Sequence, residues 1–364
     1  MRILRVAQKA YPDVTGGGAY HVHAMSRDQA AMGHDVTLLT VGEGPRREFR
    51  DGYEVLRYPS WGAVVGNDIA PGVAWHLVSH ADEFDVVHAH SHLYFSTNLA
   101  AAFRQLSETP LAITNHGLFS QNAPEEVFHW YLKTVGKWTF NSADVLFCYT
   151  DPDRERLREY GVMTDVAVVP NGIDTERFTP GDKIHHAMPD GTNVLFVGRL
   201  VEGKRPGDAL EGFVGVVEEH PDASMVFAGE GALREELRCR AETLGIAESV
   251  RFLGHLEYEE MPSVYRGANV LVLPSRAEGL PRTVLEAMAS GVPVVSSHLD
   301  HTAPVVRQGG KTVPVGDVEG YAVALNQVLS SQTQLGEQGR RAVVNGFRWE
   351  NTVAQTTAQL AEIR

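Results

Sequence analysis

The chain has 364 residues, of which 43% are hydrophobic and 21% are charged, and its formal net charge is −14 at pH 7. This length predicts two domains, each with a core of its own. The acidic balance argues against a nucleic-acid partner, because phosphate backbones need a basic surface, and it gives no overall attraction to anionic membranes.

The cysteines and the apolar segments indicate the cellular compartment of the protein. Cys148 and Cys239 form no metal or disulfide pattern, which is typical of a reducing compartment. No segment reaches the ~18 apolar residues of a membrane span. The N-terminal stretch is too short and too polar for a signal peptide. We therefore expect a cytoplasmic protein.

The first half alternates strands and helices. Apolar runs predict strands at 2–7, 35–40, 55–58, 85–88, 111–114, 145–149 and 166–169. The stretch 20–32, ended by Gly33, predicts the first helix. This order is typical of a parallel sheet with crossover helices.

A glycine run, Gly16, Gly17 and Gly18, follows the first strand. It does not match the GxGxxG dinucleotide fingerprint, and the loop before it is too long for that turn. The glycines leave bare backbone at the carboxyl edge of the sheet, where open α/β sheets bind ligands. The alternative is a flexible turn without a ligand.

Several histidines follow strand ends. The run from His88 to His92 has metal-like spacing, but no Cys or carboxylate cluster accompanies it, so we expect no metal there. His116 comes directly after the strand 111–114 and should face the ligand crevice. A purely structural histidine is equally consistent with that position.

The stretch 124–140 predicts a helix. Its apolar residues fall on one stripe, which favours packing into the core: Phe128, Tyr131, Leu132, Val135 and Trp138. The alternative is a surface that meets a lipid acceptor, because polar and aromatic residues flank the stripe: Trp130, Lys133 and Lys137. A weak peripheral contact with a membrane is the corresponding expectation.

Asp151 and Asp153 resemble the DxD motif of metal-dependent sugar transferases. We favour a helix cap instead, with Asp151 as the N-cap of a helix at 154–160.

Turn residues at 170–174 and a polar stretch at 175–193 predict a domain boundary. Strands then follow at 193–197, 224–228, 250–253, 269–273 and 292–296. We therefore predict an α/β chain of two Rossmann-like domains, 1–171 and 172–349, whose parallel sheets face a central cleft that holds the ligand.

The stretch 271–297 is the most informative. A strand ends at Pro274, a polar turn follows, and a helix runs from Pro281 to Gly291. The amides of Gly279, Leu280 and Arg282 lie at or near the start of this helix, where free N–H groups and the helix dipole favour an anion.

Two carboxylates, Glu278 and Glu286, flank this anion site. If the stretch between them were helical, they would be ~12 Å apart, which suits two acceptors that hold hydroxyls on either side of a diphosphate. The alternative is a glutamate on the helix dipole and a second, solvated one.

Further candidates follow other strands of the second half. Arg199 and Lys204 lie in its first loop, at the same sheet edge as Glu278, and would clamp a diphosphate. Glu230, between two glycines, ends the next strand at that edge. Phe252 begins a Phe-Leu-Gly run that could hold a base.

Together these motifs resemble glycosyltransferase family 4, which are retaining enzymes of the GT-B fold. The resemblance covers nearly the whole chain. It rests on the glycine loop, His116-Gly117, PNGID at 170–174 with 177–180, GRL and Lys at 198–204, GEG at 229–231, FLG at 252–254 and EGLPRTVLEAMASGVPVV at 278–295. The last of these is the most specific.

The resemblance implies a role for each candidate in the first domain and for the two cations. Gly17 and Gly18 would give backbone contact to the donor diphosphate or to the acceptor. His116 would contact the donor sugar. Arg199 and Lys204 would bind the diphosphate and stabilise the leaving nucleoside diphosphate.

It also implies roles for the helix region. Glu278 would hold hydroxyls of the donor sugar, the amides of Gly279 and Leu280 the phosphate, and Glu286 the ribose. The last helix, from about 350 to 364, would pack on the first domain. One departure concerns the clamp loop, where the family often has Lys-Gly and this chain has Lys204 followed by Arg205.

The implied function is transfer of a hexose from a UDP-sugar or GDP-mannose to an acceptor hydroxyl, with retention and without a metal or another cofactor. A nucleotide-sugar epimerase of the same fold and a non-catalytic nucleotide-binding homologue are the alternatives. The acceptor could be a sugar, a lipid-linked sugar or a small molecule, and the sequence selects none of these.

Overall fold

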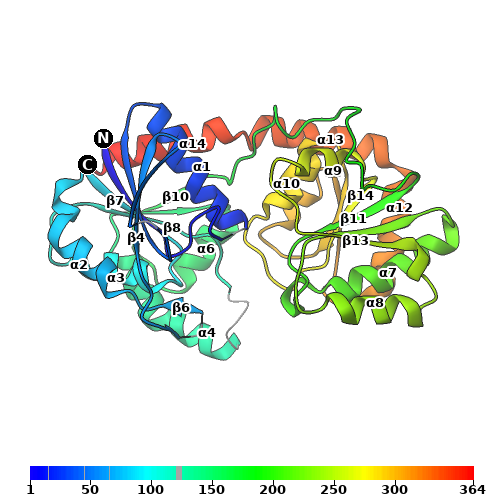
Figure 1. Ribbon diagram of the computed structural model, residues 1–364, viewed down its shortest axis with the longest axis horizontal. Helices are drawn as coiled ribbons and strands as arrows, with labels where there is room; N and C mark the ends of the chain where they lie inside the picture. The colour runs from blue at the N-terminus through cyan, green and yellow to red at the C-terminus, as the bar shows by residue number, and fades with distance from the viewer. Residues whose placement is uncertain (15, 45, 65, 120–124) are drawn as a thin grey trace. The chain divides into compact units, whose positions relative to one another are not determined.

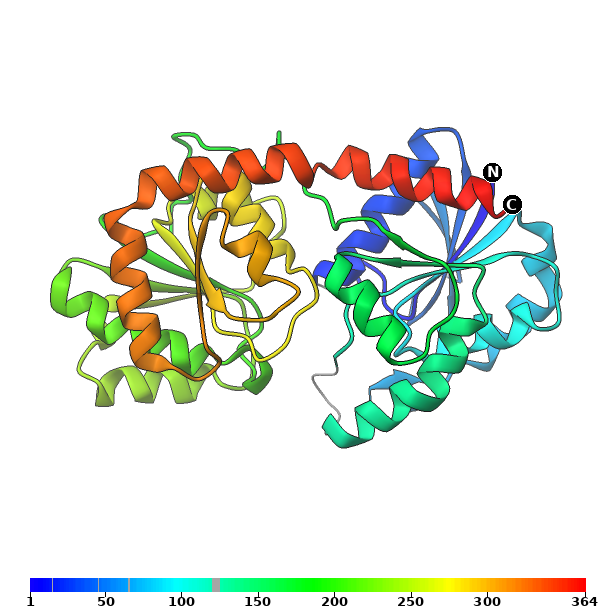
Figure 2. The ribbon, with the colours of Figure 1, turned by 180° about the vertical axis from the view of Figure 1, so that it is seen from behind.

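The computed structural model describes residues 1–14, 16–44, 46–64, 66–119 and 125–364. The chain divides into two compact units (Figures 1 and 2). Unit 1 comprises Met1–Pro170 and Asn351–Arg364, and unit 2 comprises Asn171–Glu350. The domains predicted from the sequence are 1–171, joined by the last helix, and 172–349.

Unit 1 is built on an eight-stranded sheet in the order β10-β9-β8-β7-β1-β2-β4-β3, in which only β3 is antiparallel to its neighbour. The strands are β1 (Arg2–Val6), β2 (Asp35–Val41), β3 (Arg47–Arg50), β4 (Tyr53–Tyr58), β7 (Val86–His90), β8 (Leu111–Thr114), β9 (Val145–Cys148) and β10 (Val166–Val168). A separate two-stranded ribbon pairs β5 (Ala63–Val64) with β6 (Asn67–Asp68).

Helices cover both faces of this sheet (Figures 1 and 2). They are α1 (Gly17–Ala31), α2 (Pro71–His80), η1 (Ala81–Glu83), α3 (Phe95–Arg104), α4 (Glu125–Tyr131), η2 (Leu132–Gly136), α5 (Lys137–Asn141), α6 (Asp151–Glu159) and α14 (Trp349–Glu362). Leu4 and Val6 pack with apolar residues of α2, α3, α5 and α6, whereas Ile3 packs with Val22 of α1 and Leu360 of α14. Burial on both faces explains why these strands are continuous apolar runs.

The C-terminal helix α14 belongs to unit 1 from Asn351 onward. The Thr352 hydroxyl donates to the carbonyl of Pro170 at 2.8 Å, and Gln29 Nε2 donates to Thr357 Oγ1 at 2.8 Å. Both termini lie side by side in this unit (Figures 1 and 2).

Unit 2 contains a six-stranded parallel sheet in the order β13-β12-β11-β14-β15-β16. Its strands are β11 (Asn193–Val197), β12 (Ser224–Ala228), β13 (Val250–Gly254), β14 (Val270–Leu273), β15 (Val294–Ser297) and β16 (Gly310–Val313). Its helices are η3 (Glu202–Lys204), α7 (Pro206–Glu219), α8 (Arg234–Thr243), η4 (Ala247–Ser249), α9 (Met261–Arg266), α10 (Arg282–Ala289), α11 (Ala303–Val306), α12 (Val318–Ser330) and α13 (Gln332–Gly346).

The strand orders fix where ligands can bind. In unit 2 the chain moves outward in opposite directions from β11 and from β14, which are neighbours. In unit 1 the same reversal occurs between β1 and β7. Loops that leave the carboxyl ends of such strand pairs diverge and leave a crevice, the usual ligand site of an open α/β sheet.

Three local predictions were wrong. The first helix begins at Gly17 rather than Tyr20, so Gly17 and Gly18 form its first turn. The N-cap of α6 is Thr150, whose hydroxyl accepts from the amide of Asp153 at 3.2 Å, and Asp151 is the first helical residue. The stripe of the helix predicted at 124–140 is broken by the π-helical turn η2.

That π-helical turn rotates the buried face of the helix. An i→i+5 turn contains one residue more than an α-helical turn, so the residues after it no longer follow the earlier stripe. Phe128 and Leu132 are buried as predicted, but Val135 and Trp138 are exposed, and Phe140 takes their place in the core.

Candidate functional site

The loops after β11 and β14 meet at the carboxyl edge of the unit 2 sheet. Lys204, in the first loop, forms an ion pair with Glu278, in the second. The amide of Arg276 donates to the carbonyl of Gly203 at 3.0 Å, which joins the two backbones. The structure thus brings together two residues that the sequence had singled out separately.

The backbone at Arg205 explains the departure from the family pattern. Its φ of 50° and ψ of 48° are left-handed, a conformation in which glycine is unstrained. A hydrogen bond of the side chain offsets the cost of this conformation: Arg205 Nε donates to Asp208 Oδ2 at 2.6 Å, in the first turn of α7. The loop therefore holds Arg205 in a left-handed turn, a conformation that glycine adopts without strain.

Glu278 is held from two sides. It is only 8% exposed, and besides its bond to Lys204 its carbonyl accepts from His301 Nε2 at 2.6 Å. His301 follows β15, so a third loop of the same sheet edge supports the site. Sequence reasoning missed His301, although its position just beyond a strand end was a usable signal.

The helix start lies next to this pair. Pro281 is the N-cap of α10 and Arg282 its first residue, and Gly279 and Leu280 come immediately before. The carbonyl of Leu280 accepts from Asn171 Nδ2 at 3.3 Å, which fixes the peptide from the other side. This arrangement provides backbone amides and the positive end of a helix dipole beside a lysine ammonium group.

Glu286 lies in a buried network. It is 4% exposed, and its two carboxylate oxygens accept from the hydroxyls of Tyr258 at 3.0 Å and Tyr265 at 2.9 Å. Burial raises the pKa of Tyr265 well above its ordinary value, and the neighbouring carboxylate adds to that effect. Arg282 completes the network, since its Nη2 donates to Tyr258 at 2.9 Å. Contact with a ribose therefore remains a prediction for Glu286.

The Gly-Glu-Gly segment after β12 packs closely on the Arg199 loop. A Cβ on Gly229 would collide with the carbonyl of Gly198, and one on Gly231 with the carbonyl of Leu200. The amide of Leu200 donates to the carbonyl of Glu230 at 2.8 Å. The glycines are thus required by backbone packing, which holds Arg199 exposed at the sheet edge.

Glu230 and Phe252 have protein contacts of their own. The carboxylate of Glu230 lies 3.5 Å from Arg234 Nη1. The ring of Phe252 stacks on Phe227 with 5.0 Å between the centroids, and the guanidinium groups of Arg234 and Arg238 lie over it. These are packing contacts against β12 and α8, so a donor-binding role for Phe252 stays a prediction.

In unit 1, His116 is held through both ring nitrogens. Its Nδ1 is 2.6 Å from the Tyr149 hydroxyl, and its Nε2 is 3.2 Å from His90 Nδ1. Each of these residues ends or follows a strand at the carboxyl edge. Tyr149 and His90 were not assigned any role from the sequence.

This histidine cluster is kept neutral by burial. Burial lowers the pKa of His116 to about 4, and it lowers the pKa values of His88 and His90 well below their ordinary value, with the positive charge of Arg5 adding to the effect. Arg5 Nη2 donates to His88 Nδ1 at 3.3 Å, so His88 carries its proton on Nε2 and donates it to Thr114 Oγ1 at 2.8 Å.

Gly17 and Gly18 are exposed in the first turn of α1. A Cβ built on Gly18 would meet nothing within 4 Å, so the backbone there is open to a ligand. The two glycines and His116 lie in unit 1, whereas Arg199, Lys204, Glu278, Gly279, Leu280 and Glu286 lie in unit 2.

Neither a metal-ligand cluster nor a membrane-spanning helix occurs among the described residues. Over the part of the chain that the structure describes, no group of three or more His, Cys, Asp or Glu side chains is placed to hold a metal ion. Among those same residues, no helix has both the length and the apolar character needed to cross a bilayer.

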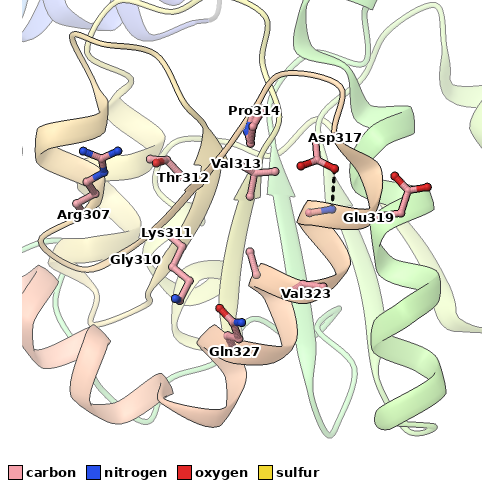
Figure 3. A pocket seen from close by; sticks show the side chains of 12 residues that line it. Arg307, Gly310, Lys311, Thr312, Val313, Pro314, Asp317, Glu319, Val323 and Gln327 are labelled. Carbon is pink, nitrogen blue, oxygen red and sulfur yellow. Dashed lines mark hydrogen bonds between the residues drawn. The ribbon is translucent and has the colours of Figure 1, made fainter.

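A cavity of about 580 Å³ lies at the edge strand β16 and helix α12 (Figure 3). Arg307, Lys311, Asp317 and Gln327 are among its lining residues. Asp317 is already used there as the N-cap of α12, where it accepts from the amide of Gly320 at 3.0 Å. None of the predicted site residues lines this cavity, so it is separate from the Lys204 and Glu278 loops.

Comparison with known families gives one match in each half of the chain. Residues 15–177 match the family model described as Glycosyltransferase Family 4, and residues 182–346 match the one described as Glycosyl transferases group 1.

Named relatives align over most of the chain. D-inositol 3-phosphate glycosyltransferase of Corynebacterium urealyticum is 32% identical over 302 residues, covering 76% of this chain and 71% of that protein. Glycogen synthase of Mycobacterium tuberculosis is 29% identical over 397 residues, covering 99% of this chain and 94% of that protein.

Solved structures share the fold. Sucrose-phosphate synthase from Thermosynechococcus elongatus superposes with a TM-score of 0.83 at 22% identity, covering 100% of this chain and 98% of that chain. Anabaena HepE in complex with UDP and glucose superposes with a TM-score of 0.82 at 18% identity, covering 100% of both chains.

Proposed function

Because this chain belongs to glycosyltransferase family 4, we propose that it transfers a hexose from a nucleotide diphosphate sugar to an acceptor hydroxyl, with retention at the anomeric carbon. The chain is a glycosyltransferase of the GT-B fold. The donor, the stereochemical course and the residue roles below are the proposed part.

The observation that supports this proposal best is the position of Lys204 and Glu278 beside the start of α10. Departure of a nucleoside diphosphate develops negative charge on the phosphate that leaves the sugar. Fixed cations and amides aimed at that charge stabilise the transition state, because their orientation needs no rearrangement during the reaction. Lys204, Arg199 and the amides of Gly279 and Leu280 are the groups of this kind at the sheet edge.

Glu278 has two functions in this proposal. In the free enzyme its carboxylate neutralises Lys204 and keeps the ammonium group in place. When the diphosphate binds, its charge competes for Lys204, and a Glu278 oxygen becomes available to accept hydrogen bonds from hydroxyls of the donor sugar. A carboxylate has about four lone-pair sites, so sharing between Lys204 and a sugar is chemically feasible.

The transfer step follows from this charge arrangement. The bond between the anomeric carbon and the phosphate oxygen breaks as an oxocarbenium-like sugar forms. The acceptor hydroxyl attacks from the same face, and the departing phosphate takes its proton, so the anomeric configuration is retained. In this scheme Arg199, Lys204 and the helix start supply the positive charge that a metal would otherwise supply, and the reaction needs no metal.

A UDP-sugar is the favoured donor. HepE, which shares the fold, was solved in complex with UDP and with UDP-glucose. Relatives named for glycogen synthesis and for inositol 3-phosphate as acceptor differ in acceptor while sharing the family, so they support the reaction class more than any one acceptor.

The test is an NMR assay with UDP-glucose, UDP-N-acetylglucosamine and GDP-mannose, each with and without a panel of acceptors, in buffer that contains EDTA. We expect nucleoside diphosphate release, slow hydrolysis without acceptor and an α-linked product from an α-linked donor. An epimerised sugar without acceptor would support the epimerase alternative. Binding without turnover for every pair would support the non-catalytic alternative, and an inverted linkage or full inhibition by EDTA would overturn the proposed mechanism.

A further inference from the structure

The cavity beside β16 and α12 lies along the free edge of the unit 2 sheet, because β16 is the last strand and pairs with β15 alone (Figure 3). On the β15 side, the carbonyls of Gly309 and Val313 accept from the amides of Val294 at 3.1 Å and His298 at 2.7 Å. Peptide groups alternate in direction along a strand, so the amide of Thr312 faces the free edge. There it can donate to a ligand in the cavity.

Two cations line the cavity near this edge. Arg307 follows α11, and Lys311 lies on β16 with its side chain directed toward Gln327 of α12 (Figure 3). Among the described residues, Lys311 has neither an ion pair nor a hydrogen bond, and Arg307 pairs with no carboxylate but donates from Nη2 to His298 Nδ1 at 3.3 Å. A guanidinium group, an ammonium group and a free amide are the donors that hold a phosphate.

The start of α12 supplies acceptors at the other end of the cavity. Asp317 Oδ1 caps α12 by accepting from the amide of Gly320 at 3.0 Å, and Glu319 is exposed. Both carboxylates lie away from Arg307 and Lys311 (Figure 3). Carboxylates accept from hydroxyls and repel a second anionic group. With about 580 Å³, the cavity therefore suits a small molecule that has one anionic end and several hydroxyls, as a sugar phosphate has.

The cationic end of the cavity is connected to the donor site. His298, whose Nδ1 accepts from Arg307, lies directly after β15. Three residues later, His301 Nε2 donates to the carbonyl of Glu278 at 2.6 Å. A ligand that binds Arg307 therefore acts on the same segment that holds the Glu278 loop.

The acidic end of the cavity borders the clamp loop. A Cβ built on Gly316 would lie 3.2 Å from Arg205 Nη2, so Arg205 packs against the turn between β16 and α12. Asp317, in the same turn, lines the cavity, and Arg205 directly follows Lys204. Two separate contacts thus join the cavity to the loops that carry Glu278 and Lys204.

We propose that this cavity is a regulatory site for a sugar phosphate. The phosphate binds the Thr312 amide with Arg307 and Lys311 beside it, and the sugar hydroxyls donate to Glu319. The bound ligand restrains the segments next to the donor site, which lowers the entropic cost of ordering the Glu278 loop around a nucleoside diphosphate. Binding at the cavity is independent of the proposed transfer reaction, whereas its effect on the donor site rests on that proposal.

Calorimetric titration with mannose 6-phosphate tests the site, with mannose and inorganic phosphate as separate titrants. We expect mannose 6-phosphate to bind, and mannose and phosphate alone to bind at least about tenfold more weakly. Lys311→Ala and Arg307→Ala should each weaken binding of mannose 6-phosphate by about tenfold, because each removes a charged donor to the phosphate. Lys183→Ala, which removes an exposed lysine outside the cavity, should match the wild type.

Titration with UDP, with and without saturating mannose 6-phosphate, tests the coupling. We expect UDP affinity to rise by about fivefold, and by linkage UDP should raise the affinity for mannose 6-phosphate by the same factor. His298→Ala should still bind mannose 6-phosphate but lose most of this rise, because it removes the contact between Arg307 and the segment that leads to His301.

Four results would overturn the inference. Failure of the wild type to bind mannose 6-phosphate, or equal affinity in Lys311→Ala, would remove the site. Equal affinity for mannose 6-phosphate and inorganic phosphate would indicate an adventitious ion only. Competition between mannose 6-phosphate and UDP would place the ligand in the donor site, and an unchanged UDP affinity would refute regulation. If the wild type neither bound UDP nor turned over a donor, the proposed function would fail, and the titrations with mannose 6-phosphate would still decide whether the cavity is a binding site.

Discussion

The ammonium group of Lys204 is bonded to the carboxylate of Glu278, 74 residues further along the chain. Both side chains are largely withdrawn from solvent. Two residues that the sequence assigned to separate parts of the donor are therefore one electrostatic unit before any ligand binds. Changing either of them should affect both stability and turnover.

Lys204→Ala should lower kcat/KM by about 10²–10³-fold, because it removes one fixed charge from the leaving group. It should also lower the free energy of unfolding by about 1–3 kcal/mol, since Glu278 is left buried without its cation. Adding Glu278→Gln to Lys204→Ala should recover stability but not activity. Steady-state kinetics and urea unfolding measure the two effects, with exposed Lys183→Ala as the control. Additive stability losses in the double variant would contradict the coupling.

Glu286 has two roles to separate, ribose binding and support of the buried tyrosines. Tyr265→Phe removes one hydrogen bond to the carboxylate and should cost about 1 kcal/mol of stability without changing affinity for UDP. Glu286→Gln should in addition weaken UDP binding by about tenfold, because a carboxylate accepts from hydroxyls more strongly than an amide does. Calorimetric titration with UDP is the measurement. Equal UDP affinity in the two variants would limit Glu286 to a structural role.

His90 and Tyr149 together should fix the tautomer of His116. His90 Nε2 is buried and lacks a hydrogen-bond partner within the described residues. A buried acceptor without a hydrogen bond costs less free energy than a buried N–H donor without one. His90 then carries its proton on Nδ1 and donates to His116 Nε2, which leaves the His116 proton on Nδ1, facing the Tyr149 hydroxyl.

Nitrogen-15 NMR of labelled histidine should therefore show the Nδ1–H form of His116 in the wild type and a mixed population in Tyr149→Phe. Turnover should fall by about tenfold, as expected for one misplaced hydrogen bond. Tyr160→Phe is the matched control, because its hydroxyl lies 3.0 Å from His129 Nδ1 on the exposed surface. An unchanged His116 spectrum in Tyr149→Phe would refute this role.

Acid should destabilise unit 1 through its neutral histidines. The pKa values of His88, His90 and His116 are lowered in the folded chain, whereas the unfolded chain binds protons below about pH 6.5. Above about pH 6.5 these histidines are neutral in both the folded and the unfolded chain, and the free energy of unfolding is highest. As the pH falls below this value, the unfolded chain binds protons that the folded chain does not. Each such group then lowers the free energy of unfolding by about 1.4 kcal/mol per pH unit. Urea unfolding at pH 7.5 and pH 5.0 measures the loss. In His90→Asn the difference between the two pH values should shrink, and an equal difference would contradict the assignment.

Most strands could be predicted because each sheet is buried on both faces, which makes a strand a continuous apolar run. The strand at 111–114 and the strand at 193–197 have the predicted limits. The π-helical turn at Leu132–Gly136 could not be predicted, because the sequence there has the same apolar spacing as an uninterrupted α-helix. Local periodicity carries no information about such a turn.

In the candidate site, too, single residues could be predicted from the sequence but the contacts between them could not. Glu278 and Lys204 could be selected from the sequence, since each follows a strand end. Their pairing could not, because it depends on β11 and β14 being neighbours in the sheet. The network around Glu286 was missed for a similar reason, since Tyr258 and Tyr265 come from a different segment and meet it only after folding.

The central claim is that a nucleoside diphosphate binds at the carboxyl edge of the unit 2 sheet, and a crystal structure of the protein with bound UDP tests it most directly. We expect the diphosphate within hydrogen-bonding distance of the Gly279 and Leu280 amides and of the Arg199 and Lys204 side chains. A diphosphate bound elsewhere, or Lys204 directed away from it while still paired with Glu278, would contradict the claim.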